Sequence, residues 1–318
     1  MGNPRIALVG AGSMGSLHAR VISQSERADL AYVVDSQREA GAPVAERFGT
    51  TWVPELDGAT DVDAVVVAAV TEAHHALGLQ VLRRGLPLLM EKPLADRLVD
   101  AEELVALSTE KDVPLMCGLL ERYNPAIMTA LSFVEHPQHV TAVRHSPYVP
   151  RIRTGASSDL LIHDIDSVLR LAGSEPSAVR GSFGYLHPDS PDRSEDVAEA
   201  MLGFPTGMVA NISASRVSQR KVRHFAIAEA NRLVEVDMLR NAVTIYRHVL
   251  NDAGPDGLSY KQQTIIEIPT LISAREPLAV QLDRFLDLAT GALDAAGERA
   301  SILPPHRTVQ AVRDNAAA

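Results

Sequence analysis

Short apolar runs alternate with amphipathic stretches over the first 120 residues. The run 62–68 is almost wholly valine and alanine, which is typical of a strand buried on both faces of a sheet. The predicted strands are 5–9, 30–34, 62–68, 86–90 and 113–117, and the predicted helices are 13–24, 39–48, 71–84 and 96–110. This alternation predicts a doubly wound parallel α/β sheet with right-handed crossovers.

Beyond residue 120 the pattern changes to strands joined by Gly, Pro, Asn and Asp. The strands are predicted at 140–148, 179–186, 197–204, 208–215, 222–228, 233–237 and 242–246, with helices at 158–171, 276–290 and 309–315. This half predicts an α/β domain with a large, mostly antiparallel open sheet. We therefore divide the chain into domains 1–120 and 121–318, as its length of 318 residues also suggests.

Composition excludes some classes of function. Thirty basic and forty acidic residues give a net charge of −10, which argues against non-specific binding to nucleic acid or an anionic membrane. The longest apolar run, 64–70, is far shorter than the roughly 20 residues of a membrane span. The single cysteine, Cys117, lies in an apolar run, so we expect it to be buried and the compartment to be reducing. A strand and a glycine loop open the chain in place of a signal peptide, and we expect a cytoplasmic protein.

A glycine loop joins the first predicted strand to the first predicted helix. Gly10-Ala-Gly12-Ser-Met-Gly15 fits G-x-G-x-x-G, in which the glycines allow a tight turn, close approach of a pyrophosphate and close helix packing. Asp35 follows the next strand, where it can accept hydrogen bonds from the ribose hydroxyls. We predict a dinucleotide site that includes Gly10, Gly12, Ser13, Met14, Gly15 and Asp35. Ser36 favours NAD over NADP, although Arg38 keeps NADP open.

Two further segments carry candidate chemistry. Asp159 and His163 are four residues apart and are predicted to share one helix face. Lys92, in Glu91-Lys92-Pro93, follows the predicted strand 86–90 at the carboxyl edge of the sheet, where doubly wound folds bind ligands. Beside a nucleotide, these groups can take a proton from a hydroxyl while a hydride leaves the adjacent carbon. The structural alternatives are a capping acid, a core histidine and a surface Glu–Lys pair, and the Lys92–Pro93 bond is a candidate cis bond.

The order and spacing of several motifs resemble the Gfo/Idh/MocA oxidoreductases, the glucose–fructose oxidoreductase and inositol dehydrogenase family. The motifs are the glycine loop continuing to His18, then His74, Glu91-Lys92-Pro93, Gly118-Leu-Leu-Glu-Arg122-Tyr-Asn124-Pro125 and Asp159-Leu-Leu-Ile-His163-Asp164-Ile-Asp166. The resemblance is specific from Arg5 to about Gly173. One departure is Ala69-Val70 before Thr71, where the family often has Thr-Pro.

The resemblance implies a Rossmann domain followed by a substrate-binding and oligomerisation domain, and we expect a homodimer or homotetramer through the second sheet. It also implies that Lys92, Asp159 and His163 are catalytic. His163 would be the general base, Asp159 would orient or help charge it, and Lys92 would stabilise the reacting oxygen. The residues it implies at the cofactor, besides the glycine loop and Asp35, are Thr71, His74, Glu91, Lys92 and Arg122.

The predicted substrate contacts are Lys92, Asn124, Arg151, Arg153, Asp159 and His163. Arg151 and Arg153 could grip a phosphate, or be solvated loop arginines. The resemblance favours oxidation of the 3-hydroxyl of a nucleotide-linked amino sugar, with an inositol-like polyol as the alternative and the direction of reaction open. A non-catalytic dinucleotide-binding regulator is a third reading, which retention of the three catalytic positions disfavours. We expect no metal site, because His163, Asp164 and Asp166 point around the helix and no second cluster completes a site.

Overall fold

The computed structural model describes residues 2–150, 152–191, 194–251 and 261–317. The chain divides into two compact units, Met1–Leu120 with Arg275–Arg307, and Glu121–Ala274 with Thr308–Ala318. The predicted boundary after residue 120 coincides with the first of these divisions. The structure differs from the predicted division at 275–307, which we had placed in the second domain and which belongs to unit 1.

Ion pairs to helix α1 and to the loop that follows it explain why residues 275–307 belong to unit 1. Helix α7 (Pro277–Ala289) packs against α1 (Ser13–Ser23). Arg20 pairs with Glu276, and Arg27 pairs with Asp283 at 3.4 Å and with Asp287 at 2.5 Å. Sequence periodicity alone predicts the helix but not its partner, because these contacts join residues more than 250 positions apart.

Unit 1 contains the predicted parallel sheet. Its strands are β1 (Arg5–Val9), β2 (Asp29–Val34), β3 (Thr51–Val53), β4 (Ala64–Val67), β5 (Leu88–Glu91) and β6 (Leu115–Gly118). Their order is β3-β2-β1-β4-β5-β6, and every pair is parallel. All four residues of β4 are buried, as the valine-rich run predicts, and Cys117 on β6 is buried too. The doubly wound fold is confirmed.

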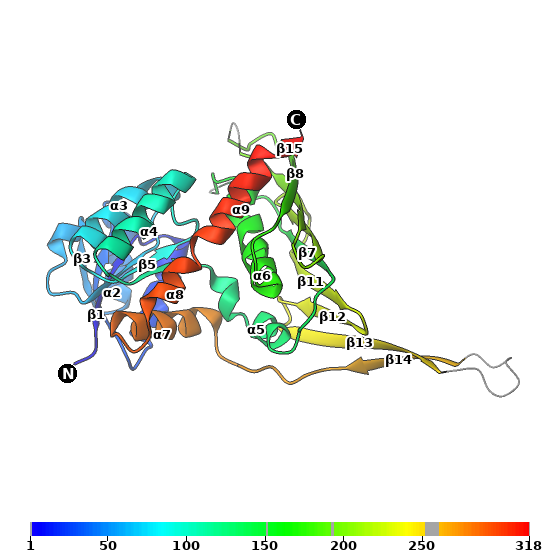
Figure 1. The fold of residues 1–318 in the computed structure, drawn as a ribbon. Coiled ribbons are helices and arrows are strands. Elements are labelled where there is room, and N and C mark those ends of the chain that lie inside the picture. The colour runs from blue at the N-terminus through cyan, green and yellow to red at the C-terminus, as the bar shows by residue number, and fades with distance from the viewer. Residues whose placement is uncertain (1, 151, 192–193, 252–260, 318) are drawn as a thin grey trace, which may run out of the picture. The chain divides into compact units, whose positions relative to one another are not determined.

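Helices lie on both sides of this sheet. Besides α1 and α7 they are α2 (Arg38–Arg47), α3 (Thr71–Arg83), α4 (Leu98–Glu110), α8 (Ala295–Ala300) and the 3-10 turn η1 (Leu56–Gly58). Figure 1 shows α3 and α4 on one side of the sheet and α7 on the other. The carboxyl ends of β1, β4 and β5 remain as the edge from which the glycine loop, Thr71 and Lys92 follow.

Unit 2 is built on a nine-stranded sheet, mostly antiparallel as predicted. Its strands are β7 (His139–His145), β8 (Ala178–Gly184), β9 (Val197–Gly203), β10 (Val209–Ser215), β11 (Val222–Glu229), β12 (Arg232–Asp237), β13 (Ala242–Asn251), β14 (Lys261–Glu267) and β15 (Ala316–Ala317). The order is β14-β13-β12-β11-β7-β10-β9-β8-β15, with parallel pairing only between β10 and β7 and between β15 and β8 among the described strands.

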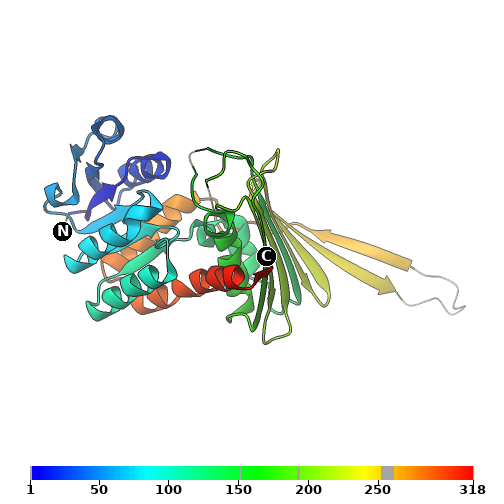
Figure 2. The same cartoon turned by 90° about the horizontal axis from the view of Figure 1, so that it is seen from above.

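Helices cover one face of this second sheet. They are α5 (Pro125–Leu131), the π-helical turn η3 (Ser157–Leu161), α6 (Ile162–Ala172) and the end of α9 (Leu303–Asp314), with a 3-10 turn η2 (Leu120–Tyr123) before them. Figure 2 shows α5 and α6 on one face and no helix of the described residues on the other. Burial alternates along β7, so that one row of side chains packs under the helices and the other faces outward.

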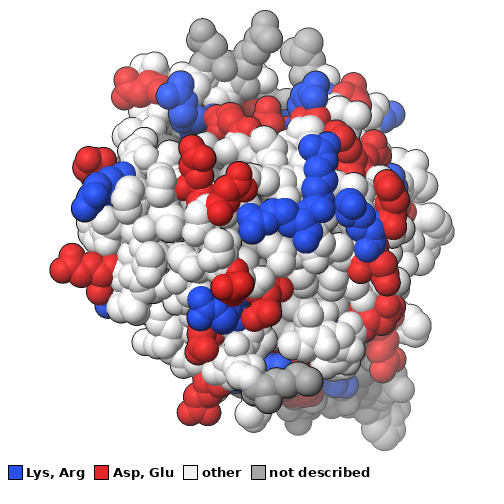
Figure 3. All heavy atoms as spheres, turned by 90° about the vertical axis from the view of Figure 1, so that its left-hand side faces the viewer, with Lys and Arg blue, Asp and Glu red and all other residues white. Residues whose placement is uncertain are grey.

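The helices and the surface of the described residues can be compared for hydropathy and charge. No helix among the described residues is long and apolar enough to cross a membrane. On the face drawn in Figure 3, the basic side chains of the described residues stand among acidic ones. This face therefore offers no broad basic area of the kind that attracts nucleic acid.

Candidate active site

The glycine loop of unit 1 has the geometry that a dinucleotide requires. Gly10 has φ of +93°, and a Cβ there would stand 2.6 Å from the carbonyl oxygen of Ala68. A Cβ on Gly15 would stand 1.9 Å from the oxygen of Gly10, so helix and strand need a glycine at this position. By contrast, a Cβ on Gly12 would meet no atom within 4 Å. Gly12 thus borders open space at the N-cap of α1, where the amides of Ser13 and Met14 have no helical partner and suit a phosphate.

Asp35 is held against this loop. One carboxylate oxygen accepts a hydrogen bond from the amide of Ala11 at 2.8 Å, and the other accepts from the amide of Gln37 at 2.9 Å. Arg38 lies over the ring of Trp52, with 5.4 Å from its guanidinium carbon to the ring centroid. The carboxylate is therefore fixed in orientation beside the glycine loop, as ribose recognition requires. This geometry fits NAD.

A buried ion pair anchors the strand end before Lys92. Glu91 is the last residue of β5, and its Oε1 accepts a hydrogen bond from His18 Nε2 at 2.8 Å. Its Oε2 accepts from the Lys92 amide at 3.2 Å. Burial by itself raises the pKa of Glu91, but the hydrogen bond and charge of His18 outweigh it and the pKa is lowered. His18 and Glu91 together fix the point at which the loop that carries Lys92 leaves the sheet.

Two further histidines hold the loop after Lys92. His74 Nδ1 donates to the carbonyl oxygen of Pro93 at 2.8 Å, and the amide of Leu94 donates to His306 Nε2 at 2.9 Å. Burial lowers the pKa of His74, against the effect of the carbonyl groups it faces. The Lys92–Pro93 bond is cis, as predicted. Lys92 is partly exposed while Pro93 and Leu94 are buried, so its side chain leaves an otherwise packed loop.

The role of His306 was missing from the sequence reading. The segment Pro304-Pro305-His306 carries no recognisable motif, and its partner Leu94 is 212 positions away. Thr71, in contrast, stands where predicted, as the first residue of α3. It follows Val70, which is 69% exposed at the carboxyl end of β4. His74, Glu91 and Lys92 all belong to this edge of unit 1, and both His74 and Glu91 hold the loop around Lys92.

Asp159 and His163 are prominent on the helical segment of unit 2. Throughout the run 155–169, only these two residues are partly exposed and the rest are buried. The prediction of one continuous helix at 158–171 is wrong in this respect. The segment begins with the π-helical turn η3 and continues as the α-helix α6. Asp159 lies in the π turn and His163 near the start of α6. The shared exposure of the acid and the imidazole agrees with one common face.

The other two acids of the motif are bound to arginines. Arg144 pairs with Asp164 at 2.7 Å and with Glu121 at 2.7 Å. Arg122 forms a bidentate pair with Asp166, through Nε at 2.9 Å and Nη2 at 2.7 Å. Within the described ranges, no cluster of three or more His, Cys, Asp or Glu could hold a metal ion. Asp164 and Asp166 thus join α6 to β7 and to the 120–124 segment.

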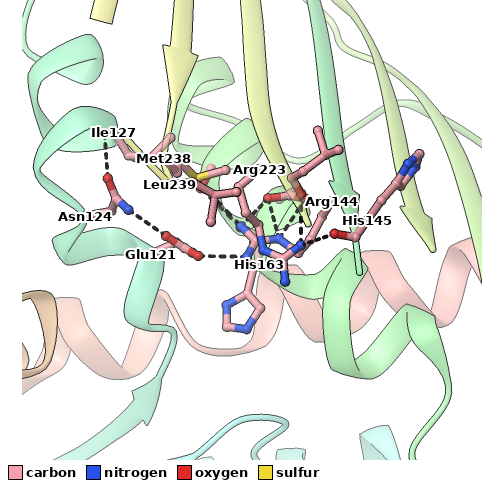
Figure 4. Close-up of polar contacts among 12 residues, drawn as sticks. Glu121, Asn124, Ile127, Arg144, His145, His163, Arg223, Met238 and Leu239 are labelled. Carbon is pink, nitrogen blue, oxygen red and sulfur yellow. Dashed lines mark hydrogen bonds and ion pairs between the residues drawn. The ribbon is translucent and has the colours of Figure 1, made fainter. Parts of the chain in front are cut away.

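The remaining predicted substrate contacts occupy different surroundings. Asn124 caps α5, with its Oδ1 accepting from Ala126 N at 3.0 Å and its Nδ2 donating to Glu121 at 3.1 Å. Figure 4 shows this chain of contacts from Asn124 through Glu121 to Arg144. Arg153 is exposed in the loop before η3, and Arg151 lies outside the described residues. The ion pair of Arg122 and the hydrogen bonds of Asn124 described above stabilise the local fold of unit 2. The spacing of the motifs did not indicate these contacts.

Comparison with known proteins identifies the class. Residues 4–119 match the oxidoreductase family with an NAD-binding Rossmann fold, and residues 130–231 match the GFO/IDH/MocA C-terminal domain. The chain belongs to the Gfo/Idh/MocA family of NAD-binding oxidoreductases, and the resemblance read from its motifs is confirmed.

The chain is also similar to individual proteins of this family. The chain is 29% identical to UDP-N-acetylglucosamine 3-dehydrogenase of Acidithiobacillus ferrooxidans over 89% of this chain and 88% of that protein. A solved structure of that enzyme superposes with a TM-score of 0.86 at 27% identity, covering 99% of this chain and 98% of the other. Inositol 2-dehydrogenase of Acidothermus cellulolyticus is 31% identical over 66% of each chain.

Proposed function

We propose that this enzyme uses NAD to oxidise a secondary hydroxyl of a nucleotide-linked sugar, the 3-hydroxyl of an amino sugar in particular, or runs the reverse reduction. The observation that carries the proposal is the joint exposure of Asp159 and His163 in an otherwise buried run of fifteen residues, 155–169. An acid and an imidazole kept accessible in this way suit proton transfer. The similarity to UDP-N-acetylglucosamine 3-dehydrogenase extends over most of both chains and supports the substrate class.

Each catalytic residue has one task in this proposal. His163 takes the proton from the substrate hydroxyl, and Asp159 orients the imidazole and stabilises its charged form. Lys92 donates a hydrogen bond to the same oxygen and stabilises the negative charge that develops there. NAD, held by the glycine loop and Asp35, supplies the hydride acceptor. The clamped loop around Lys92 keeps its ammonium group in a defined direction, which reduces the entropy lost in reaching the reactive geometry.

An inositol-like cyclic polyol is the second candidate substrate. It is favoured by the similarity to inositol 2-dehydrogenase of Acidothermus cellulolyticus. The two candidates share the same chemistry at the reacting carbon and differ in whether a nucleotide is attached. A panel of UDP-sugars, hexoses, hexose phosphates and inositols, each tested with NAD and NADP, separates them by the nicotinamide absorbance that develops. Absence of turnover with every compound would instead favour a dinucleotide-binding regulator.

Replacement of Lys92 tests the catalytic assignment. We expect Lys92→Ala to lower kcat on the preferred substrate by about 100-fold or more, since proton-transfer and oxyanion groups each contribute factors of this size. NAD affinity should change little, because the glycine loop and Asp35 are intact. Lys111→Ala, which removes an exposed lysine that ends helix α4, is the matched control and should keep full turnover. Normal turnover of Lys92→Ala would show that the assigned role is wrong.

We also propose that copies of the chain associate through the outward face of the unit 2 sheet. Exposed apolar side chains on its strands support this, with Met201 49% exposed, Val209 39% and Ile266 60%. A large exposed apolar surface is a common sign of association. Light scattering of the purified protein is expected to give the mass of a dimer or tetramer, and a monomeric mass would contradict the proposal. A cytoplasmic location is proposed as well, from the single buried cysteine.

A further inference from the structure

A basic pocket opens at one end of the unit 2 sheet. It has a volume of about 320 Å³ and lies where β11 begins and β12 ends. Its wall contains four cationic side chains and one acid, in a chain whose net charge is −10. The residues that line it include Arg220, Lys221, Arg223, His224, Asp237 and Arg240. A concentration of positive charge in so acidic a protein indicates an anionic ligand.

The one acid of the pocket is already engaged. Asp237 Oδ1 accepts hydrogen bonds from the amides of Leu239 at 3.0 Å and Arg240 at 3.1 Å, and its Oδ2 lies 3.5 Å from Arg240 Nη1. The carboxylate therefore shapes the turn after β12 and offsets one cation at most. Arg220, Lys221 and Arg223 keep the pocket positively charged.

Arg223 is the most enclosed of these cations. Its Nη1 donates to the carbonyl oxygens of His145 at 2.8 Å and Val222 at 2.9 Å, and among the described residues no carboxylate forms an ion pair with it. Burial and the nearby charge of Arg144 lower its pKa. Arg144 has Asp164 and Glu121 as partners, whereas the Nε and Nη2 of Arg223 are not used by any of the structure's hydrogen bonds among those residues. An anion in the pocket would accept the hydrogen bonds that Nε and Nη2 of Arg223 can donate.

The pocket adjoins the catalytic segment of the same unit. Asp159 is close enough to Arg223 for its negative charge to favour the charged guanidinium. Arg223 also lies opposite Arg144 where strand β11 pairs with β7. Figure 4 draws Arg223 and Leu239, both from the pocket wall, together with Arg144 and with His163 below them. A ligand bound in the pocket could therefore extend to the exposed acid and imidazole.

We propose that this pocket binds the diphosphate of the nucleotide-sugar substrate; the assignment rests on the proposed function and specifies the second contact point of that substrate. Guanidinium groups bind phosphate oxygens through paired, charge-assisted hydrogen bonds, and an ammonium group adds a point charge. A volume of about 320 Å³ also lies at the lower end of the range for small-molecule sites, which suits the diphosphate portion alone. An inositol-like polyol carries no phosphate, so it would leave these cations without an anionic partner.

Direct binding of UDP to the full-length protein with saturating NAD tests the pocket. Titration calorimetry is carried out on the wild type, on Arg220→Gln with Lys221→Gln, and on Arg170→Gln with Lys111→Gln. The control pair also removes one exposed arginine and one exposed lysine, and neither of them lines the pocket. We expect the pocket variant to bind UDP at least tenfold more weakly and the control to stay within twofold. Equal affinity in all three proteins, or no binding of UDP to the wild type, would overturn the assignment.

Smaller probes separate the diphosphate from other sources of affinity. Uridine should bind far more weakly than UDP, and inorganic phosphate should bind more weakly than pyrophosphate. Uridine binding as tightly as UDP would show that the base alone is recognised, and phosphate equal to pyrophosphate would point to a monophosphate ligand. Either result contradicts the proposal. Unfolding by urea checks that the variants remain folded.

Turnover separates failure of the pocket from failure of the proposed function. With a UDP-sugar substrate, the pocket variant should raise KM at least tenfold with little change in kcat, because the contact is made in ground and transition states alike. If UDP-sugars are oxidised and the pocket variant keeps its KM, the proposed function stands and the pocket assignment fails. If UDP binding depends on the pocket but no UDP-sugar is oxidised, the pocket binds a nucleoside diphosphate and the proposed function fails.

Discussion

Replacing His306 with alanine would remove the acceptor for a buried backbone amide two residues after Lys92. The amide of Leu94 donates to His306 Nε2 at 2.9 Å, and the Nδ1 of the same ring donates to the carbonyl oxygen of Ile302 at 2.7 Å. Leu94 is 0% exposed and His306 is 7% exposed, so water cannot easily take the place of the ring. The donor would be left unsatisfied.

The size of the effect follows from this geometry. An unsatisfied buried donor costs about 1–3 kcal/mol, which we expect as the loss in unfolding free energy. A chain of this size then loses roughly 1–2 °C in Tm per kcal/mol. A shift of the loop that gave the Leu94 amide another acceptor would also move Lys92, and a misplacement of about 1 Å can lower turnover about 100-fold. We therefore expect kcat to fall by roughly 10- to 100-fold while NAD affinity is nearly unchanged.

A conservative variant distinguishes positioning from simple loss of stability. The side-chain oxygen of glutamine can reach the position of the histidine Nε2 and accept from Leu94, so His306→Gln should recover most of kcat. His306→Asn is too short to do so and should resemble the alanine variant. The measurements are steady-state kcat, NAD dissociation constant and urea unfolding for the three proteins. An alanine variant with unchanged kcat, or a glutamine variant as impaired as alanine, would refute the reasoning.

Two further predictions concern unit 1. Gly12→Ala should keep the fold, because its Cβ meets nothing within 4 Å, yet weaken NAD binding at least tenfold; Gly15→Ala, whose Cβ would stand 1.9 Å from a carbonyl oxygen, should lose about 1–3 kcal/mol of stability. Unfolding curves and NAD titrations check both, and equal behaviour of the two variants would count against this account of the loop. The pKa of Glu91 is lowered in the folded protein, so its charged form stabilises the fold at pH values above its ordinary pKa of 4.5. This contribution to stability is lost as the pH falls through the lower pKa of the folded state. The advantage of the wild type over Glu91→Gln in unfolding free energy should therefore shrink on acidification below about pH 5, and a constant difference would contradict it.

Much of the fold is predictable because its signal is local. Valine-rich strands, glycine turns and amphipathic helices can each be recognised within about ten residues, and five of the six strands of the parallel sheet follow from their alternation. The strand Thr51–Val53 escaped prediction because three residues carry no periodicity. Helix Ala295–Ala300 is also short, and Lys261–Glu267 lacks a clear apolar alternation. The π turn before α6 has the same apolar spacing as an α-helix would, so sequence could not separate the two.

Only part of the candidate site could be predicted from neighbouring residues in the sequence. The glycine loop and the Lys92–Pro93 geometry could be read from motifs, because each depends on neighbouring residues. Asn124, which we predict to contact the substrate, also caps a helix, and the proline that follows it suits a helix start. His306 and the basic pocket depend on contacts between distant segments. No spacing rule could have indicated them without the fold.

Helix α9 begins in unit 1 at Leu303 and ends in unit 2 at Asp314, with the division after Arg307. A chimaera between relatives therefore needs three junctions, one after residue 120, one after residue 274 and one inside this helix. An expression fragment that stops at residue 120 would leave out His306 and the α7 ion pairs. The nucleotide-binding unit in such a fragment would lack the side chain that holds the loop around Lys92.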